Sequence, residues 1–138
     1  MLWLLVHLVT TAVLAGVGWV VQVVVYPAFA LVGAGEWPEY HRRHVVRIGW
    51  VVGPPWLVQG VSVGMLLLAS PWEFALLGVL AAAGVALTVL AAVPAHERLD
   101  TDRDLRILLR ANLLRSLVWS AATVVSAVQL ASGLPFTP

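Results

Sequence analysis

Three histidines near the ends of apolar segments are the first residues that can do chemistry. His41 and His44 are three residues apart in EYHRRHVVRIGW, and His96 lies in VPAHERL. Residues three apart on a helix are neighbours, so His41 and His44 can face the same partner. Imidazole titrates near neutral pH, and we therefore expect His41, His44 or His96 to act as a general base.

Cationic and amide side chains accompany these histidines. Arg47 follows His44 on the same stretch, and Asn112 and Arg115 interrupt an apolar run near the C-terminus. Such donors can stabilise a developing oxyanion. An ionisable group inside a membrane span costs about 2.5–3.5 kcal/mol on insertion scales, and most that remain face a cavity or a partner. The alternative is that both arginines only extend to the lipid headgroups.

Helical spacing assigns these side chains to common faces. Steps of three and four residues return to the same side of a helix, which places Trp119 with Asn112 and Arg115. Tyr26 can orient a phenolic or quinone-like ring. The predicted catalytic residues are His96, Arg115, Asn112 and His44. The predicted substrate-binding residues are Gln22, Tyr26, Arg47 and Trp119.

A metal site is a second interpretation of the histidines. Two imidazoles from one helix and a third from a neighbour can hold zinc, copper or iron with one position open. That set would be His41, His44 and His96, with no cysteine in the chain to add a thiolate. Haem is less favoured because His7, about 22 Å along its helix from Gln22 at ~1.5 Å per residue, has no histidine at matched depth. We expect either no cofactor or a single transition metal.

Composition places the protein in a membrane. Of 138 residues, 61% are apolar and 11% are charged, whereas soluble domains have about 25% charged residues. A net charge of +1 with scattered arginines excludes nucleic acid as a partner. We predict one all-α domain, an integral membrane four-helix bundle, because four apolar segments approach the ~20 residues that cross a bilayer. Their ranges are roughly 2–31, 45–69, 72–93 and 111–131.

The arginines predict the orientation. All eight basic residues are arginines, and they lie in the first and third loops or the adjoining helix ends. Loops rich in Arg and Lys stay in the cytosol. We therefore expect a multi-pass protein of the cell (inner) membrane with both termini outside. The polar side chains of all four helices then meet at one depth on the cytosolic side.

Prolines and hydroxyls predict the helix ends. The first helix should end after Pro27, and the third should stop near Pro94, because proline removes a backbone donor. Pro54 and Pro55 lie inside the second span and should kink it, which can open a cavity. A capping box formed by Thr101 and Asp104 should start the fourth helix before the membrane.

Small residues at four-residue spacing mark two helix faces. Gly60 and Gly64 share one face of the second span, and Gly78, Ala82 and Ala86 share one face of the third. Small residues allow helices to approach closely in a membrane. These faces can pack helices within the chain or between copies of a homo-oligomer.

Several motifs resemble a family of small four-span membrane proteins. VYPAF, YHRRH followed by IGWVVGP, and VPAHERL followed by NLLRSLVW are similar to motifs of a family, mostly of unknown function, that includes the anthrone-oxygenase-like proteins. The resemblance implies oxygenation of an activated aromatic carbon by molecular oxygen without an evident cofactor. It also implies that His96, Asn112 and Arg115 are the site residues.

The favoured hypothesis is a membrane oxidoreductase or oxygenase that binds a lipophilic aromatic or quinone-like molecule at its cytosolic end. A small transporter or channel-forming oligomer is a second possibility, although the polar residues lie mainly on one side. A third is an accessory subunit of a membrane complex. In that case the polar residues would only lock the helix ends together.

Overall fold

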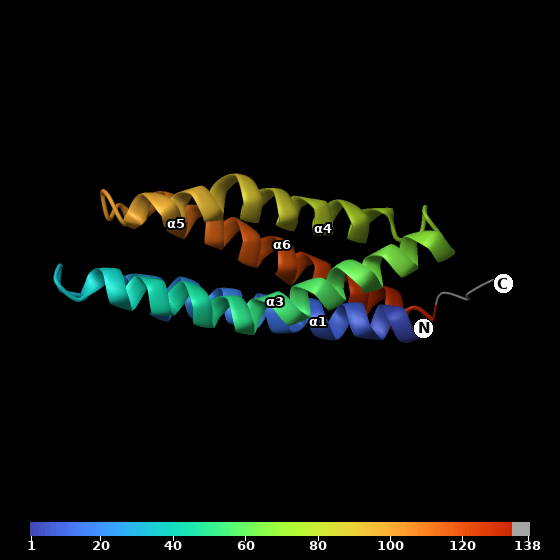
Figure 1. Ribbon diagram of the computed structural model, residues 1–138. Helices are drawn as coiled ribbons and strands as arrows, with labels where there is room; N and C mark the ends of the chain where they lie inside the picture. The colour runs from blue at the N-terminus through green and yellow to red at the C-terminus, as the bar shows by residue number, and fades with distance from the viewer. Residues whose placement is uncertain (134–138) are drawn as a thin grey trace.

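The computed structural model describes residues 1–133, and within this range the chain is helical without strands (Figure 1). Four long helical segments run side by side, joined by short loops. The first and third are each divided by a π-helical stretch. The elements are α1 (Leu2–Val20), η1 (Val21–Val25), α2 (Tyr26–Phe29), α3 (Trp37–Ala69), α4 (Ala75–Leu87), η2 (Thr88–Ala92), α5 (Val93–Leu99) and α6 (Leu105–Ala131).

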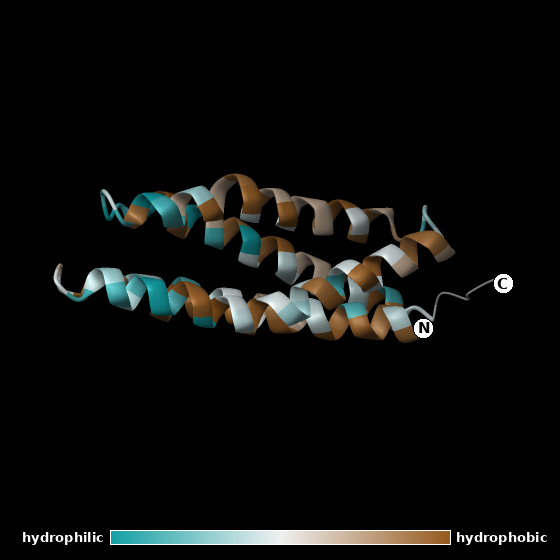
Figure 2. Cartoon of the chain, viewed as in Figure 1, coloured by the Kyte–Doolittle hydropathy of each residue, from teal (hydrophilic) through white to brown (hydrophobic). Residues whose placement is uncertain are grey.

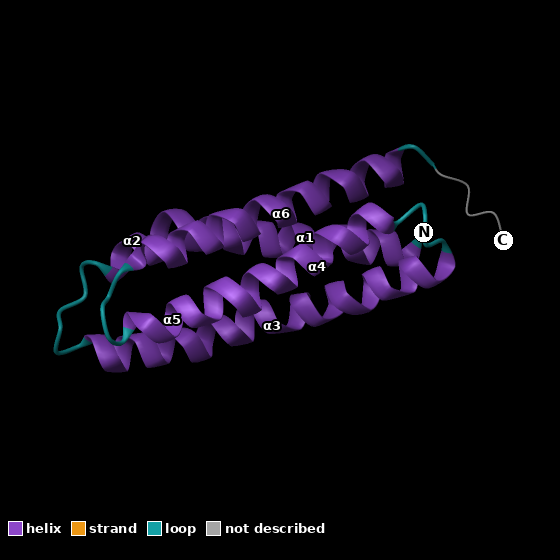
Figure 3. Cartoon of the chain, turned by 90° about the horizontal axis from the view of Figure 1, so that it is seen from above, coloured by secondary structure: helices purple, strands orange, loops and turns teal. Residues whose placement is uncertain are grey.

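All four segments are long and apolar enough to cross a membrane, as predicted. Their ranges are Leu2–Phe29, Trp37–Ala69, Ala75–Leu99 and Leu105–Ala131. Hydrophilic residues gather at the end of the bundle that carries the loops of residues 30–36 and 100–104 (Figure 2). Figures 1 and 3 both place these two loops together, opposite the start of α1 and the end of α6. We call this end the polar end.

The two π-helical stretches explain how the first and third segments pass their prolines. The Tyr26 amide donates to the Val21 carbonyl just before Pro27, and the Val93 amide donates to the Thr88 carbonyl just before Pro94. A wider turn shifts the hydrogen-bond pattern where proline has no N–H. The third segment therefore continues to Leu99, past Pro94, where the sequence analysis placed its end.

The second segment is one continuous helix with two prolines inside it. α3 contains Pro54 and Pro55, and in Figure 1 its two halves run in different directions. Missing backbone donors and the proline rings are the usual cause of such a bend. α3 packs mainly against α1 and less extensively against α4. The contact with α1 extends to the end of the bundle away from the polar end, where His7 and Ser62 are 3.0 Å apart. The space between α3 and α5 at the polar end is where the cavity described below lies.

Close packing between α1 and α6 forms the centre of the bundle. α1 contacts both α3 and α6, and α6 also contacts α4. At the polar end the buried core is aromatic and aliphatic, with Tyr26, Phe29 and Trp37 packed near Leu99 and Leu108. The inward face of the first helix follows from helical spacing, because His7, Thr11, Gly18 and Tyr26 recur at steps of four, seven and eight residues and are all buried.

The fourth helix begins differently from the prediction. Asp104 itself is the N-cap of α6, and its Oδ1 accepts a hydrogen bond from the Arg106 amide at 2.9 Å. The Thr101 amide instead donates to the Arg98 carbonyl, in the turn that ends α5. The predicted capping box is therefore wrong in register, because the turn after α5 takes up Thr101 before α6 begins.

The small-residue faces behave differently from one another. A Cβ placed on Gly60 or Gly64 would meet no atom within 4 Å, so these residues do not pack against another helix of this chain. A Cβ on Gly78 would lie 3.1 Å from the Leu67 side chain. The close approach on α4 is thus made by a leucine of α3. Association of copies through Gly60 and Gly64 stays a prediction.

Candidate functional site

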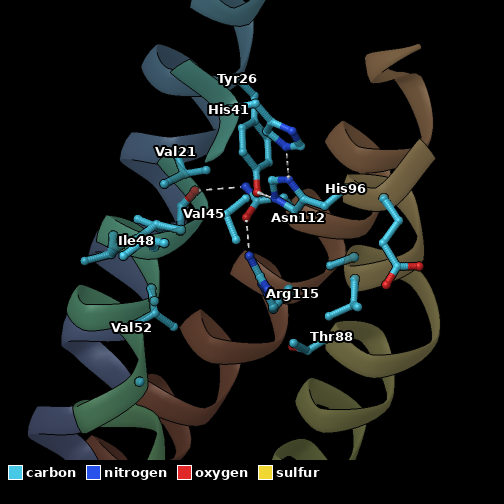
Figure 4. A pocket seen from close by; sticks show the side chains of 18 of the residues that line it. Val21, Tyr26, His41, Val45, Ile48, Val52, Thr88, His96, Asn112 and Arg115 are labelled. Atoms are coloured by element: carbon cyan, nitrogen blue, oxygen red, sulfur yellow. Dashed lines mark hydrogen bonds between the residues drawn. The ribbon is translucent and has the colours of Figure 1, made fainter. Parts of the chain in front are cut away.

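A cavity of about 650 Å³ lies in the half of the bundle nearest the polar end. All four helical segments contribute to it. Most of its wall is apolar, with valines, glycines and Trp56 from α1 and α3. The polar side chains at the wall include Tyr26, His41, Thr88, His96, Asn112 and Arg115 (Figure 4).

Asn112 is the fixed centre of the polar wall. Its side chain is fully buried, and its Nδ2 donates to the Gly18 carbonyl at 3.0 Å and to Gln22 Oε1 at 2.9 Å. Its Oδ1 accepts a hydrogen bond from Arg115 Nη2 at 2.9 Å. Both ends of the amide are used, so the orientation of Asn112 is determined by three partners. Arg115 is thereby held toward the cavity.

Arg115 is a half-buried cation without a carboxylate beside it. Among residues 1–133 no acidic side chain lies within ion-pair distance of its guanidinium. Its Nε is buried and has no hydrogen-bond partner, and the guanidinium carbon lies 5.1 Å from the centre of the Trp119 ring. A cation in an apolar setting is costly unless an acceptor or anion approaches it. Arg115 can therefore receive an anionic or acidic oxygen from a ligand.

A chain of hydrogen bonds leads from the cavity to the surface of the polar end. Tyr26 OH lies 3.0 Å from His96 Nε2, and His96 Nδ1 lies 3.1 Å from His41 Nε2. His41 Nδ1 lies 2.6 Å from Asp100 Oδ1. Both ring nitrogens of His41 and both of His96 therefore have a hydrogen-bond partner. Figure 4 shows His96 between Tyr26 and His41 on one side of the cavity.

Of the remaining predicted site residues, only Trp119 belongs to the cavity wall. His44 packs edge-on against Phe29, with ring centroids 4.8 Å apart, and is not part of the cavity wall. Its buried Nε2 has no partner within the described residues. Arg47 is exposed and also outside the wall, which fits the headgroup alternative. Gln22 lies behind Asn112 and supports it, whereas Trp119 does line the cavity.

The three histidines are near one another but are not arranged around a common point. Within the described residues, no group of three or more His, Cys, Asp or Glu side chains is placed to hold a metal ion. His41 and His96 stack with their ring planes at 15° and share a hydrogen bond, so their nitrogens point at protein partners. The metal site at His41, His44 and His96 therefore has no geometric support in this arrangement.

Two features of the polar end were missed in the sequence. Asp100 is four residues after His96, so helical spacing alone could have placed it on the same side. Trp37 is the second: it is 4% exposed and stacks on His41 at 4.8 Å between ring centroids. The guanidinium carbon of Arg103 lies 4.5 Å from the centre of the same Trp37 ring.

A second buried polar cluster lies in the opposite half of the bundle. His7 is fully buried, and its Nδ1 is 3.0 Å from the hydroxyl of Ser62. That hydroxyl donates to the Gln59 carbonyl at 2.9 Å. His7, which is not among the predicted site residues, thus lies in a separate cluster with a serine on α3 as its partner.

The site therefore combines an unpaired cation, an asparagine held by three partners and a tyrosine–histidine pair around an apolar cavity. The resemblance to anthrone-oxygenase-like proteins rests on motifs whose residues contribute to this wall, among them Tyr26, His96, Asn112 and Arg115. It stays an expectation. Comparison of the chain with protein-family models, with curated proteins and with solved structures finds no match.

Proposed function

We propose that this protein is a multi-pass membrane protein that binds a lipophilic aromatic or quinone-like molecule with an acidic oxygen in the cavity. The observation that carries the proposal is Arg115, a half-buried cation at an apolar cavity wall with no carboxylate partner among residues 1–133. A ligand oxygen would satisfy the charge that the protein leaves unpaired. Charge-assisted hydrogen bonds of this kind are about twice as strong as neutral ones.

The wall favours a ring compound over a hydrophilic anion. Valine side chains of α1, η1 and α3 contribute to a largely apolar wall, and Trp56 and Trp119 add aromatic faces. Sites for small molecules commonly combine such an apolar wall with a few polar groups that fix orientation. The ring would contact the apolar wall, and its oxygen would lie toward Arg115, the side chain that Asn112 holds in place.

The same groups suit a reaction that passes through an anion. Tyr26 and His96 form a hydrogen-bonded pair at the cavity, so a proton leaving the ligand has an acceptor. Arg115 would stabilise the oxyanion that remains. We place the protein with oxidoreductases that use molecular oxygen on such an electron-rich ring, in line with the resemblance of its motifs.

The arginine distribution supports a location of the polar end in the cytosol. Arg42, Arg43, Arg98, Arg103 and Arg106 all lie in or beside the loops of the polar end. The positive-inside rule then puts both termini outside the cytosol and the cavity in the cytosolic half of the inner membrane.

Binding of a matched ligand pair tests the role of Arg115. In detergent-purified protein, 2-naphthol should bind more tightly than naphthalene, which lacks the oxygen. Arg115→Leu should reduce the affinity for 2-naphthol by about 10–150-fold, because hydrogen bonds to charged groups contribute about 1.5–3 kcal/mol. Affinity for naphthalene should change little. Arg98→Leu is the control, since Arg98 is exposed and outside the wall. Equal 2-naphthol binding by both variants would refute the proposal.

Turnover requires a separate measurement. Oxygen uptake should be followed with anthrone as the probe, because its activated ring carbon loses a proton to form an oxyanion. We expect uptake above the uncatalysed rate in the wild type and a loss in Arg115→Leu. Binding without any uptake would leave the protein a binding protein and remove the oxidoreductase assignment.

A structural lock is the second candidate function of the polar end. Arg103 Nη2 donates to the Phe29 carbonyl at 3.2 Å and to the Val32 carbonyl at 2.8 Å, which ties the third loop to the first. An accessory subunit would need this lock but no ligand. Stability that depends on a partner membrane complex, together with no binding of either naphthalene compound, would favour this candidate.

A further inference from the structure

We infer that Asp100, His41, His96 and Tyr26 form a proton relay that connects the cavity with the surface of the polar end. The inference rests on the proposed function, because the relay needs a ligand with an acidic proton in the cavity. It adds a route for that proton, which neither Arg115 nor Asn112 provides.

The three hydrogen bonds run in a single direction when both rings are neutral. The Asp100 carboxylate can only accept, so His41 Nδ1 donates to it at 2.6 Å. His41 Nε2 then accepts from His96 Nδ1 at 3.1 Å, and His96 Nε2 accepts from the Tyr26 hydroxyl at 3.0 Å. Each group is therefore a donor to the next one toward the surface.

Proton transfer along this chain requires no displacement of the side chains, because each group accepts one proton and donates another. The ligand gives its proton to the Tyr26 oxygen, and Tyr26 gives its own proton to His96 Nε2. His96 Nδ1–H passes to His41 Nε2, and His41 Nδ1–H passes to Asp100 Oδ1. The ligand is left as an anion beside Arg115, and Asp100 is left protonated until it releases the proton to water. Return of a proton reverses the same steps and restores the rings.

The two ends of the chain have the exposures that a relay requires. All four groups line the cavity, so the chain follows its wall; Tyr26 is 2% exposed at the buried end, whereas the Asp100 side chain is 61% exposed at the surface end. Between them, the His41 side chain is 6% exposed and is covered by Trp37, whose ring lies parallel to it at 13°. Trp37 thereby shields one face of the His41 ring, while His41 and His96 also line the cavity.

The charges around His96 favour passage of a proton over its retention there. His41 and His44 approach His96 from α3, Arg115 approaches from α6, and Asp100 lies at the end of its own helix. Arg115 repels a positive charge on His96, whereas Asp100 attracts one. An extra proton is thus driven away from the cavity and toward the carboxylate.

Stopped-flow mixing with 2-naphthol tests the relay. Ligand fluorescence reports binding, and a pH indicator in weakly buffered solution reports proton release. Asp100→Asn removes the final acceptor, and His41→Gln keeps one donor and one acceptor but cannot pass a proton. Each variant is studied at a 2-naphthol concentration that gives the same occupancy of the cavity. We expect both variants to release the proton from bound ligand on the order of 100-fold more slowly than the wild type, as expected when a positioned proton-transfer group is lost.

Asp102→Asn is the matched control. Asp102 is exposed and two residues from Asp100, and an asparagine there can still accept the hydrogen bond from the Asp104 amide. Its release rate should equal that of the wild type. Release at wild-type rates in both Asp100→Asn and His41→Gln would overturn the relay, as would binding without any proton release. Failure of the wild type to bind 2-naphthol would instead refute the proposed function.

Discussion

Gly18 of α1 and Ser116 of α6 are in direct contact, which leaves no room for a side chain at residue 18. A Cβ placed on Gly18 would lie 2.6 Å from Ser116 Oγ, which itself donates to the Asn112 carbonyl at 2.8 Å. The absence of a side chain at residue 18 also brings the Gly18 carbonyl within 3.0 Å of Asn112 Nδ2. The geometry of the polar wall therefore depends on a glycine one helix away from Arg115.

Gly18→Ala should destabilise the protein by about 1–3 kcal/mol, the usual cost of inserting a methyl group into a packed contact. Adding Ser116→Ala should recover part of this loss, because it removes the hydroxyl that the methyl group meets. Gly16→Ala, with nothing within 4 Å of its Cβ, should be neutral or stabilising. Denaturant unfolding in detergent measures all three; additive effects of Gly18→Ala and Ser116→Ala would contradict the contact.

Asn112→Leu should also lower stability, by about 1–3 kcal/mol, because the Gly18 carbonyl and Gln22 lose a buried donor. Thr123→Val is a suitable comparison on the same helix. The Thr123 hydroxyl donates to the Trp119 carbonyl of its own helix, so its removal breaks no contact between helices. Thermal unfolding should separate the two variants, and equal melting temperatures would argue against the role of Asn112 between helices.

The backbone conformation of Arg103 should affect stability separately from the hydrogen bonds of its side chain. Its φ is 54°, a region that glycine occupies with little strain. Both Arg103→Ala and Arg103→Gly remove the hydrogen bonds to Phe29 and Val32. Arg103→Gly should nevertheless be more stable than Arg103→Ala, by about 1 kcal/mol. The reverse order of their unfolding midpoints would rule out strain at this residue.

Asp104 should make the start of α6 sensitive to acid. The side chain of Arg106, and then its backbone amide, hydrogen-bond the carboxylate and lower the pKa of Asp104 below its usual value. A lowered pKa means that this contribution to stability is fully present above the unfolded-state pKa and is lost as the pH falls through the folded-state pKa. Asp104→Asn keeps a capping oxygen and should remove this part of the acid dependence. An unchanged pH profile of α6 amide exchange in Asp104→Asn would contradict it.

Chelation should have no effect on the protein. The ring nitrogens of His41 and His96 are bonded to Asp100, to each other and to Tyr26, which leaves them no free lone pair for a metal. We expect the melting temperature and optical spectrum to be the same before and after EDTA treatment. A stoichiometric metal in elemental analysis that disappears in His41→Ala and His44→Ala would show that the histidines rearrange.

The site residues differ in how far the sequence could locate them. Asn112, Arg115 and Trp119 lie on one face of one helix, so their spacing was sufficient to group them, and all three line the cavity. His44 is only three residues from His41 and both rings lie near His96, yet only His41 hydrogen-bonds His96 and lines the cavity. A step of three residues is about 300° of rotation, and small differences in helix rotation decide which side chain reaches a neighbour.

The sequence by itself determined the four apolar helices, the polar end and the inward face of the first helix, because hydropathy and helical period are local properties. Only the tertiary structure decided that the third helix continues past Pro94, that Ser116 packs against Gly18, and that Asp100 accepts a hydrogen bond from His41. These depend on the depth and rotation of one helix relative to another. The relative depth and rotation of two helices are set by the packing of side chains from different segments. They therefore cannot be predicted from the spacing of residues within one segment.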